Sequence, residues 1–307
     1  MVENFINKLQ SDGSFLTLEV TPAHSANFTN IIEKIKKLKL QDMVDGFSTT
    51  DNPLARLKYN SMFSALRLQQ EFKKPCITTM TMRDRNKIAL QSDMLGMNEQ
   101  DLRVILALTG DPARISDQPN AKAVNEGRST LLLDMIRCFN SGIDYSGKPF
   151  KDAPKTIYPF AVTNAAAKNS KTIYKNILTK LRHGAMAIIT QPVYDIQNAK
   201  ELIRLFEEAK KEIKYFSSEP ILILGFFPAT KLRTAQFLSS HVPGVSVPDY
   251  WMKELSKAKE VGEEQEVKKG MELSINAFKS IYEIHPKIHF MAANHFDLVK
   301  EILKVSL

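Results

Sequence analysis

The chain has 307 residues, of which 43% are hydrophobic and 25% charged, and these proportions exclude a disordered chain or a low-complexity fibre. The formal net charge is +8, from 42 Lys and Arg against 34 Asp and Glu, which favours anionic partners. Because no basic run with interleaved aromatic residues occurs, we expect a small anionic ligand and no nucleic acid.

Three features bear on the compartment. The longest uninterrupted apolar run, Ile221–Phe227, is too short to cross a bilayer, so no membrane partner is expected. Residues 1–10 are amphipathic and carry Glu3, unlike a secretory signal peptide. The two cysteines, Cys76 and Cys138, provide no disulfide framework. Together these features predict a soluble, cytoplasmic protein.

Short runs of apolar and β-branched residues alternate with helical patterns along the chain. Apolar residues three and four positions apart predict helices, for example over 31–38, 173–181 and 202–206. Strands and helices in alternation predict a parallel sheet with crossover helices. Eight strands in this length favour an α/β fold, a single (β/α)8 TIM barrel over residues 1–307. The predicted strands are Phe15–Val20, Met43–Ser48, Cys76–Met80, Val104–Leu108, Ile157–Val162, Ala185–Thr190, Ile221–Phe227 and Ile288–Met291.

An open, doubly wound sheet is the alternative fold. Against it, no predicted strand is followed by G-x-G-x-x-G, and the P-loop pattern is absent. Within the barrel, residues 111–155 are rich in Pro, Gly, Asn and Asp, and we interpret them as a long loop-plus-helix connection at the C-terminal face, with a helix over 129–139. The stretch Lys253–Glu272 alternates five Lys with six Glu, a pattern typical of a solvated helix face.

The loops that follow the strands of a TIM barrel converge at one face, so polar residues at strand ends are candidates for chemistry. Glu19 lies among Leu18, Val20 and Pro22. A carboxyl in such surroundings is either an acid with a raised pKa, suited to general-acid work, or the partner of a Lys or Arg in the barrel. The sequence leaves both interpretations open.

Other predicted strands also end in polar groups. Arg83 and Arg85 follow the third strand and can bind phosphate or carboxylate. Thr109, Gly110 and Asp111 follow the fourth, where the glycine allows the backbone to approach a ligand closely. The six histidines form no H-E-x-x-H motif and no cysteine pair accompanies them, so no metal site is expected.

Read in chain order, these strand ends resemble the methylenetetrahydrofolate reductase family. The similarity spans nearly the whole chain. The motifs that carry it are Leu18–Pro22, Leu106–Pro112, Gly184–Ala185 with Thr190–Asp195, Gly225–Pro228, and His289–Phe290 with Asn294. Further segments are similar to the reductase modules that are fused to homocysteine methyltransferase domains: Arg83–Asn86, Leu90–Ser92, Asn140–Gly142 and Tyr145–Pro149.

The resemblance implies a flavoprotein of one-carbon metabolism. It implies that FAD is the cofactor, that NADH or NADPH is the hydride donor, and that 5,10-methylenetetrahydrofolate is reduced to 5-methyltetrahydrofolate by ping-pong hydride transfer through FAD. A positively charged protein suits a diphosphate cofactor and a polyanionic folate substrate.

The resemblance also implies roles for individual residues. Glu19 would be the general acid that helps to open the imidazolidine ring, and Asp111 would lie near the flavin and the pterin. Lys180 would lie near the FAD phosphates, with Asn176 one helical turn earlier. The remaining cofactor-binding residues would be Ser48, Thr49, Thr79, Thr109, Gly110, Ala161, Thr163, Asn164 and Gln191. The substrate-binding residues would be Gln191, Tyr194, Phe237, Leu238 and His289.

The chain departs from the family pattern at two strand ends. Thr79 stands where many members have a His that contacts the flavin, and Thr50–Pro53 replaces a Tyr-Gly segment. Two other functions stay open at this point: a flavin-free, pterin-binding methyltransferase barrel, and a reductase subunit that is active only with an electron-transfer partner protein. A homo-oligomer also stays open.

Overall fold

The computed structural model describes residues 1–167, 169–214 and 218–306. Eight parallel strands close into a barrel in chain order, and β8 pairs with β1, which confirms the predicted TIM barrel. The strands are β1 (Phe15–Val20), β2 (Gly46–Thr49), β3 (Cys76–Thr81), β4 (Val104–Leu108), β5 (Tyr158–Thr163), β6 (Ala187–Pro192), β7 (Ile221–Phe226) and β8 (Lys287–Phe290). All eight overlap the predicted runs, although β2 begins three residues later than predicted.

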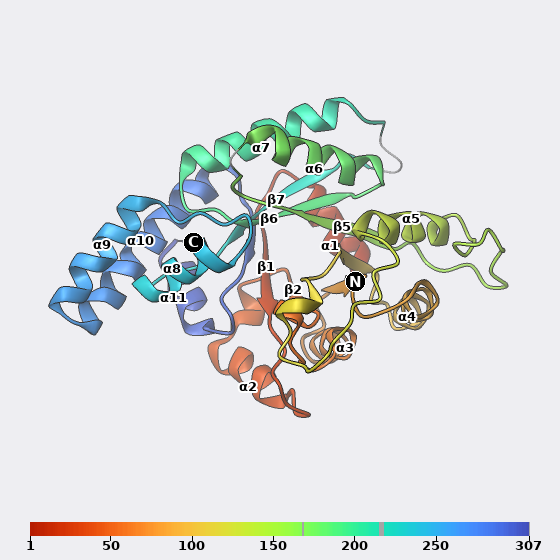
Figure 1. The fold of residues 1–307 in the computed structure, drawn as a ribbon, viewed down its shortest axis with the longest axis horizontal. Coiled ribbons are helices and arrows are strands. Elements are labelled where there is room, and N and C mark those ends of the chain that lie inside the picture. The colour runs from red at the N-terminus through yellow and green to blue at the C-terminus, as the bar shows by residue number, and fades with distance from the viewer. Residues whose placement is uncertain (168, 215–217, 307) are drawn as a thin grey trace.

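Helices surround the strands (Figure 1). The α-helices are α1 (Val2–Gln10), α2 (Thr29–Leu38), α3 (Ser61–Phe72), α4 (Lys87–Glu99), α5 (Ser129–Asn140), α6 (Ser170–Arg182), α7 (Ile196–Lys211), α8 (Leu232–His241), α9 (Asp249–Val261), α10 (Glu263–Ile284) and α11 (Phe296–Ser306). Short 3-10 helices are η1 (Leu40–Asp42), η2 (Pro53–Ala55) and η3 (Ala113–Ile115). No helix in the described ranges combines the length and the apolar character needed to cross a bilayer.

Two segments show how local chemistry shapes the helical layer. The charged stretch Lys253–Glu272 is divided between α9 and α10 at Gly262, whose φ of 155° interrupts the helix. Glu266 in this stretch is buried and accepts a hydrogen bond from the backbone N–H of Leu232, so the stretch is only partly a solvated face. Between β4 and β5, η3 and α5 are joined to the barrel by irregular segments, and α5 covers the predicted helix over 129–139.

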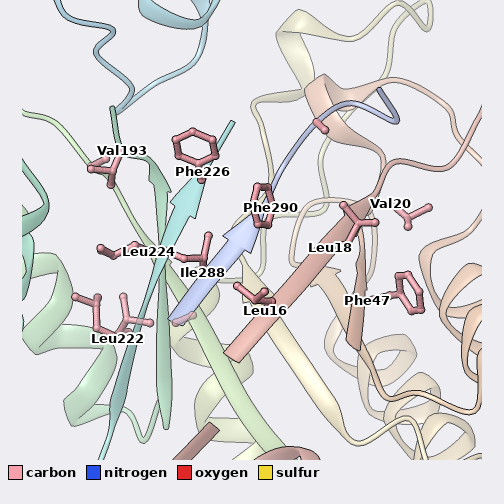
Figure 2. Packing of buried hydrophobic residues seen from close by; sticks show 14 of the residues in the cluster. Leu16, Leu18, Val20, Phe47, Val193, Leu222, Leu224, Phe226, Ile288 and Phe290 are labelled. Atoms are coloured by element: carbon pink, nitrogen blue, oxygen red, sulfur yellow. The ribbon is translucent and has the colours of Figure 1, made fainter. Parts of the chain in front are cut away.

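Alternate residues of each strand face opposite sides of the barrel wall. One set packs outward against the helices and forms the larger hydrophobic cluster. Figure 2 shows this set on neighbouring strands: Leu16, Leu18 and Val20 of β1, Leu222, Leu224 and Phe226 of β7, and Ile288 and Phe290 of β8. The other set faces the lumen, and its members in the N-terminal half of the barrel form the second cluster: Phe15, Ile77, Val104, Leu106, Phe160, Ala187, Ile189 and Ile223.

Helix α1 closes the N-terminal end of the barrel. Its buried residues Val2, Phe5, Ile6 and Leu9 belong to the same cluster as the lumen-facing strand residues. Gly46 of β2 leaves space for this helix, because a Cβ atom there would lie 2.6 Å from the Phe5 ring and 2.8 Å from the carbonyl oxygen of Pro75. The N-terminal half of the lumen is therefore filled by apolar side chains.

We expect Gly46→Ala to lower the free energy of unfolding by about 1–3 kcal/mol, because the added methyl group displaces Phe5 and with it α1. Denaturant titration of the purified protein measures this loss. Gly96→Ala is the matched control: Gly96 lies inside α4 with no atom within 4 Å of the new Cβ, so the change should stabilise the protein by up to about 1 kcal/mol. Equal stability of the two variants would show that α1 does not occupy the lumen.

Candidate active site

Polar side chains line the C-terminal half of the lumen, above the apolar cluster. On each strand they follow the apolar lumen-facing residue at a spacing of two or four positions, which keeps them on the same side of the sheet. They are Thr17 and Glu19 after Phe15 of β1, Thr79 and Thr81 after Ile77 of β3, and Gln191 after Ile189 of β6. Ser48 of β2 and His289 of β8 share this level, as the contacts of His289 with Thr17 and with Ser48 show. Glu19 and Gln191 are partly exposed at this end of the barrel, whereas the other groups are buried.

Glu19 is an acid in neutral surroundings. Its side chain keeps 23% exposure through the barrel mouth, and burial raises the pKa of its carboxyl to about 7. In the described part of the chain, the ion-pairing group within 4.0 Å of this carboxyl is His289, at 4.0 Å. Of the two interpretations that the sequence left open, the geometry therefore favours the acid with a raised pKa, because no Lys or Arg pairs with Glu19 in the described ranges.

His289 lies beside Glu19 and is almost fully buried, with 2% exposure. Its Nδ1 atom is 2.7 Å from the Thr17 hydroxyl, and its Nε2 atom is 3.3 Å from the Ser48 hydroxyl. Burial lowers the pKa of His289 to about 4, so the ring is neutral at neutral pH. A carboxyl that retains its proton up to about pH 7 and a neutral imidazole thus lie side by side in the candidate site.

A second group of contacts connects the loops after β2, β3 and β4. Asp51 is buried, accepts hydrogen bonds from the backbone N–H and the hydroxyl of Thr81, and pairs with Arg85 at 2.7 Å. Arg83 donates to Asp84 and to the carbonyl oxygen of Asn52. Arg83 and Arg85, which the sequence suggested as ligand-binding cations, therefore bind acceptor groups of the protein. The Nη1 atom of Arg83 is buried and has no hydrogen-bond acceptor among the described residues.

Asp111 is held by the same group of loops. Its carboxylate accepts a hydrogen bond of 2.6 Å from the backbone N–H of Leu54, in a turn where Asn52, Leu54 and Ala55 all have positive φ. Gly110 has a φ of 92°, and a Cβ there would lie 2.8 Å from Cβ of Arg83, so this position requires glycine on both counts. These contacts fix the Asp111 carboxylate at the C-terminal face.

A buried cation lies beside the N-terminus of α5. Lys180 of α6 is 9% exposed and donates a hydrogen bond to the Ser129 hydroxyl, and the backbone N–H of Ser129 donates to the Thr109 hydroxyl. Burial, and then the positive charge of Arg128, lower the pKa of Lys180. Within the described residues Lys180 forms no ion pair with a carboxylate. An unpaired ammonium group, a neighbouring guanidinium and a helix N-terminus are the components of an anion site.

Gln191 lies near the barrel mouth at an irregular pairing of β6 and β7. The register shifts between Ile189 and Pro192, and the Thr190 hydroxyl accepts a hydrogen bond from the N–H of Gly225 and donates one to the Gln191 carbonyl oxygen. A Cβ at Gly225 would lie 2.3 Å from the carbonyl oxygen of Thr190. The backbone around Gln191 is therefore tightly held, while its amide faces the lumen.

The other residues named from the resemblance fall into three groups. Thr49, Ala161 and Thr163 occupy positions that alternate with the lumen-facing ones, and the Thr49 hydroxyl donates to the carbonyl oxygen of Ser61. Asn164, beyond β5, and Asn176, on α6, are exposed. On α8, Leu238 is buried, whereas Phe237 is 45% exposed and its ring stacks on His241.

Tyr194 belongs to none of these groups. It is 1% exposed and packs against Trp251 and Phe226 in the layer between barrel and helices, where its hydroxyl finds no hydrogen-bond partner among the described residues. Burial raises the pKa of this phenol. The ring of Tyr194 therefore packs behind the barrel strands that form the site and does not line the lumen.

Sequence reasoning missed Thr17 and the part played by Asp51. Thr17 precedes Glu19 by two residues, so the period of a strand could have put both on one face. Asp51 belongs to the Thr50–Pro53 segment, which gives no sign of a partner, and only the folded chain brings it to Thr81 and Arg85. No cluster of metal-ligating side chains occurs within residues 1–167, 169–214 and 218–306.

A family model described as methylenetetrahydrofolate reductase matches residues 4–306. No curated protein matches the sequence. Among solved structures, a protein from Clostridium thermocellum is similar to this chain with a TM-score of 0.64 and 14% identity, covering 99% of each chain. That protein is described as uncharacterized and as binding two copies of 5-methyl-5,6,7,8-tetrahydrofolic acid.

Two further structures share the fold. A riboflavin lyase, solved with a modified FMN and riboflavin, has a TM-score of 0.59 and 9% identity, covering 95% of this chain and 90% of that chain. An F420-dependent secondary alcohol dehydrogenase, in complex with an F420-acetone adduct, has a TM-score of 0.57 and 14% identity, covering 96% and 99%. At these identities the likeness shows the common barrel alone.

Glu19→Gln should make stability less sensitive to alkali. The carboxyl has a pKa of 4.5 when solvated and about 7 in the fold, so the folded protein binds its proton more tightly and loses stability as the pH rises through this window. We expect the free energy of unfolding of the variant, relative to the native protein, to rise by about 3 kcal/mol between about pH 4.5 and pH 8. His289, whose pKa is lowered, contributes the opposite slope in both proteins.

Denaturant titrations across this pH range test the expectation. Glu260→Gln, at an exposed position of α9, is the control and should show no pH-dependent difference from the native protein. A Glu19→Gln difference that stays constant with pH would mean that the Glu19 carboxyl is solvated in the fold.

Lys180→Met should weaken anion binding and stabilise the fold at neutral pH. The variant removes the buried positive charge of Lys180 beside Ser129. Without this charge, the affinity for inorganic pyrophosphate should fall about tenfold or more. Calorimetric titration measures the affinity, and thermal unfolding measures the stability. Lys175→Met, at an exposed position of the same helix, should change neither by a comparable amount. Unchanged pyrophosphate binding by Lys180→Met would exclude the anion site.

Proposed function

Because the chain belongs to the methylenetetrahydrofolate reductase family, we propose that it reduces 5,10-methylenetetrahydrofolate to 5-methyltetrahydrofolate, with FAD as cofactor and NADH or NADPH as hydride donor. The observation that carries this proposal is the Glu19 carboxyl, whose pKa burial raises to about 7, in the polar C-terminal half of a barrel lumen whose other end is closed by α1. A folate reductase needs a proton donor at the site of ring opening, and a carboxyl with a pKa near 7 can hold that proton at neutral pH.

Structural neighbours support a folate and a flavin-type ligand. The Clostridium thermocellum protein, which has the same barrel, binds 5-methyltetrahydrofolic acid, the product of the proposed reaction. The riboflavin lyase, solved with a modified FMN and riboflavin, and the F420-dependent dehydrogenase, solved with an F420-acetone adduct, share this fold. These similarities support the proposal through the shared barrel alone, because the sequence identities are low.

The residues of the C-terminal face fit FAD. Lys180, Arg128 and the N-terminus of α5 provide positive charge for the diphosphate, and Thr109 adds a hydroxyl beside them. When bound, FAD would carry hydride from the nicotinamide to the methylene carbon of the folate. Thr79, in place of the histidine of many relatives, leaves a smaller neutral group beside that cofactor.

The chain's own residues would then divide the work. Glu19 would donate its proton to the folate nitrogen that leaves the methylene carbon, and it would become a carboxylate. Asp111, whose carboxylate is held by the N–H of Leu54, would accept hydrogen bonds from the pterin. The Gln191 amide, facing the lumen from a fixed backbone, would bind one edge of the ring system as donor and acceptor.

Glu19→Gln should separate the two halves of the reaction. Reduction of the bound flavin by NADH or NADPH should proceed at nearly the native rate, because this step requires no acid at Glu19. Reduction of 5,10-methylenetetrahydrofolate should fall by a factor of about 10²–10⁴, the usual contribution of general acid catalysis. Stopped-flow absorbance of the flavin measures both steps, and equal loss in both would contradict the role of Glu19.

The same preparation tests the two rival functions. A colourless protein that cannot be reconstituted with FAD, yet binds folate, would indicate a methyltransferase barrel. Folate reduction that appears only after a second protein is added would indicate a subunit that depends on an electron-transfer partner. Reduction by the single chain with NADH or NADPH is the outcome that we expect.

A further inference from the structure

His289 has a hydroxyl on each side of its ring. Its Nδ1 atom is 2.7 Å from Oγ1 of Thr17 and its Nε2 atom is 3.3 Å from Oγ of Ser48, and no other hydrogen bond of these two hydroxyls occurs among the described residues. The three residues come from β1, β8 and β2, which are adjacent around the barrel. Thr17 is fully buried, and His289 and Ser48 are each 2% exposed, so water does not compete for these contacts.

Each contact can run in either direction. A hydroxyl both donates and accepts, and a neutral imidazole carries one proton on either nitrogen. In one arrangement Thr17 donates to Nδ1, and the Nε2–H group donates to Ser48. In the other arrangement Ser48 donates to Nε2, and the Nδ1–H group donates to Thr17. Both arrangements contain two hydrogen bonds, so they differ little in free energy until a neighbouring charge favours one of them.

Glu19 is that neighbour. Its carboxyl is 4.0 Å from Nε2 of His289, and Glu19 and Ser48 are paired residues of adjacent strands on the lumen side. When Glu19 is ionised, the arrangement with hydrogen on Nε2 places the positive end of that N–H 4.0 Å from the carboxylate, which stabilises the negative charge. When Glu19 is protonated, this attraction is lost, and the opposite arrangement, in which Ser48 donates to Nε2, becomes available.

We propose that Thr17, His289 and Ser48 form a reversible hydrogen-bond chain that sets the proton affinity of Glu19, with His289 as a positioning residue that exchanges its ring tautomer when Glu19 gains or loses its proton. The ring stays neutral in this exchange: its one proton moves from Nδ1 to Nε2 by exchange with solvent, and the two hydroxyls rotate. The catalytic use of the chain rests on the proposed function, in which Glu19 changes its protonation state in every turnover.

Other charged groups near these residues are engaged elsewhere. Lys287, two residues before His289 on β8, donates to the carbonyl oxygens of Ser11 and Gly13 at the N-terminal end of the barrel. Asp51 pairs with Arg85, and Asp111 accepts from the N–H of Leu54. The strands on either side of β1 therefore present only Ser48 and His289 at the level of Glu19 in the described residues.

The test is a titration of the full-length protein without FAD or folate, followed by nuclear magnetic resonance. The 15N shifts of the imidazole ring distinguish a bare nitrogen from a protonated one, and the 13C shift of the Glu19 carboxyl reports its ionisation. Spectra of His289→Asn and Glu19→Gln assign the two signals. We expect the His289 proton to move from Nδ1 to Nε2 with the same midpoint as Glu19, and to stay on one nitrogen in Glu19→Gln.

Thr17→Val tests the far end of the chain. Valine neither accepts from Nδ1–H nor donates to Nδ1, and a buried N–H without an acceptor is the costlier defect, so the ring should keep its proton on Nε2. The midpoint of Glu19 should then fall by about one pH unit, the shift that corresponds to one hydrogen bond. Thr17→Ser should restore the native midpoint. The control is Thr78→Val, because the Thr78 hydroxyl lies on the outer side of β3 and has no hydrogen-bond partner in the part of the chain that the structure describes.

The outcomes distinguish this inference from the proposed reaction. A His289 ring that keeps one tautomer while Glu19 titrates would overturn the inference, even if the protein reduces methylenetetrahydrofolate. A ring that exchanges with Glu19 in a protein without reductase activity would support the inference and contradict the reaction. If Thr17→Val does not fold, the native and Glu19→Gln titrations decide the question.

Discussion

Closure of the strands into a ring is the constraint on which the other features of this protein depend. In a closed barrel every second residue of every strand faces a lumen that water cannot fill freely, so each such residue needs a protein neighbour or a ligand. The chain meets this requirement differently at the two ends. Apolar residues and α1 fill the N-terminal half, whereas the C-terminal half is lined by hydroxyls, an amide, an imidazole and a carboxyl. The division concentrates groups with altered proton affinity at the one open end.

Charge is distributed over this face in the same uneven way. Glu19, whose pKa is raised to about 7, and the neutral His289 lie within the ring of strands. Lys180, which forms no ion pair with the described residues, lies outside the ring beside α5, and the ion pair of Asp51 and Arg85 lies between loops. An extended ligand with an anionic end and a neutral, proton-accepting ring would match this arrangement, which agrees with the chemistry of a flavin and a folate.

The sequence predicts the strands well because each is a short continuous run of apolar and β-branched residues with a helical pattern on either side. It identifies Glu19 as a candidate because a carboxylate among Leu18, Val20 and Pro22 is costly to bury, but it does not decide between a raised pKa and an ion pair with a Lys or Arg of the barrel. It does not predict the role of Thr17, since a threonine in a strand is common and its partner is 272 residues away. The role of Lys180 followed only from the resemblance, because one lysine on an amphipathic helix gives no sign that it is buried.

The closing helix also constrains the order in which the chain can acquire its structure. Residues 2–10 are synthesised before all eight strands, yet their apolar face packs against strands as late in the chain as β7, through Ile223. Until β7 has left the ribosome, Val2, Phe5, Ile6 and Leu9 have no completed surface to cover them. This short segment therefore needs shielding during most of the synthesis of the barrel, by a chaperone or by transient contacts with the first strands.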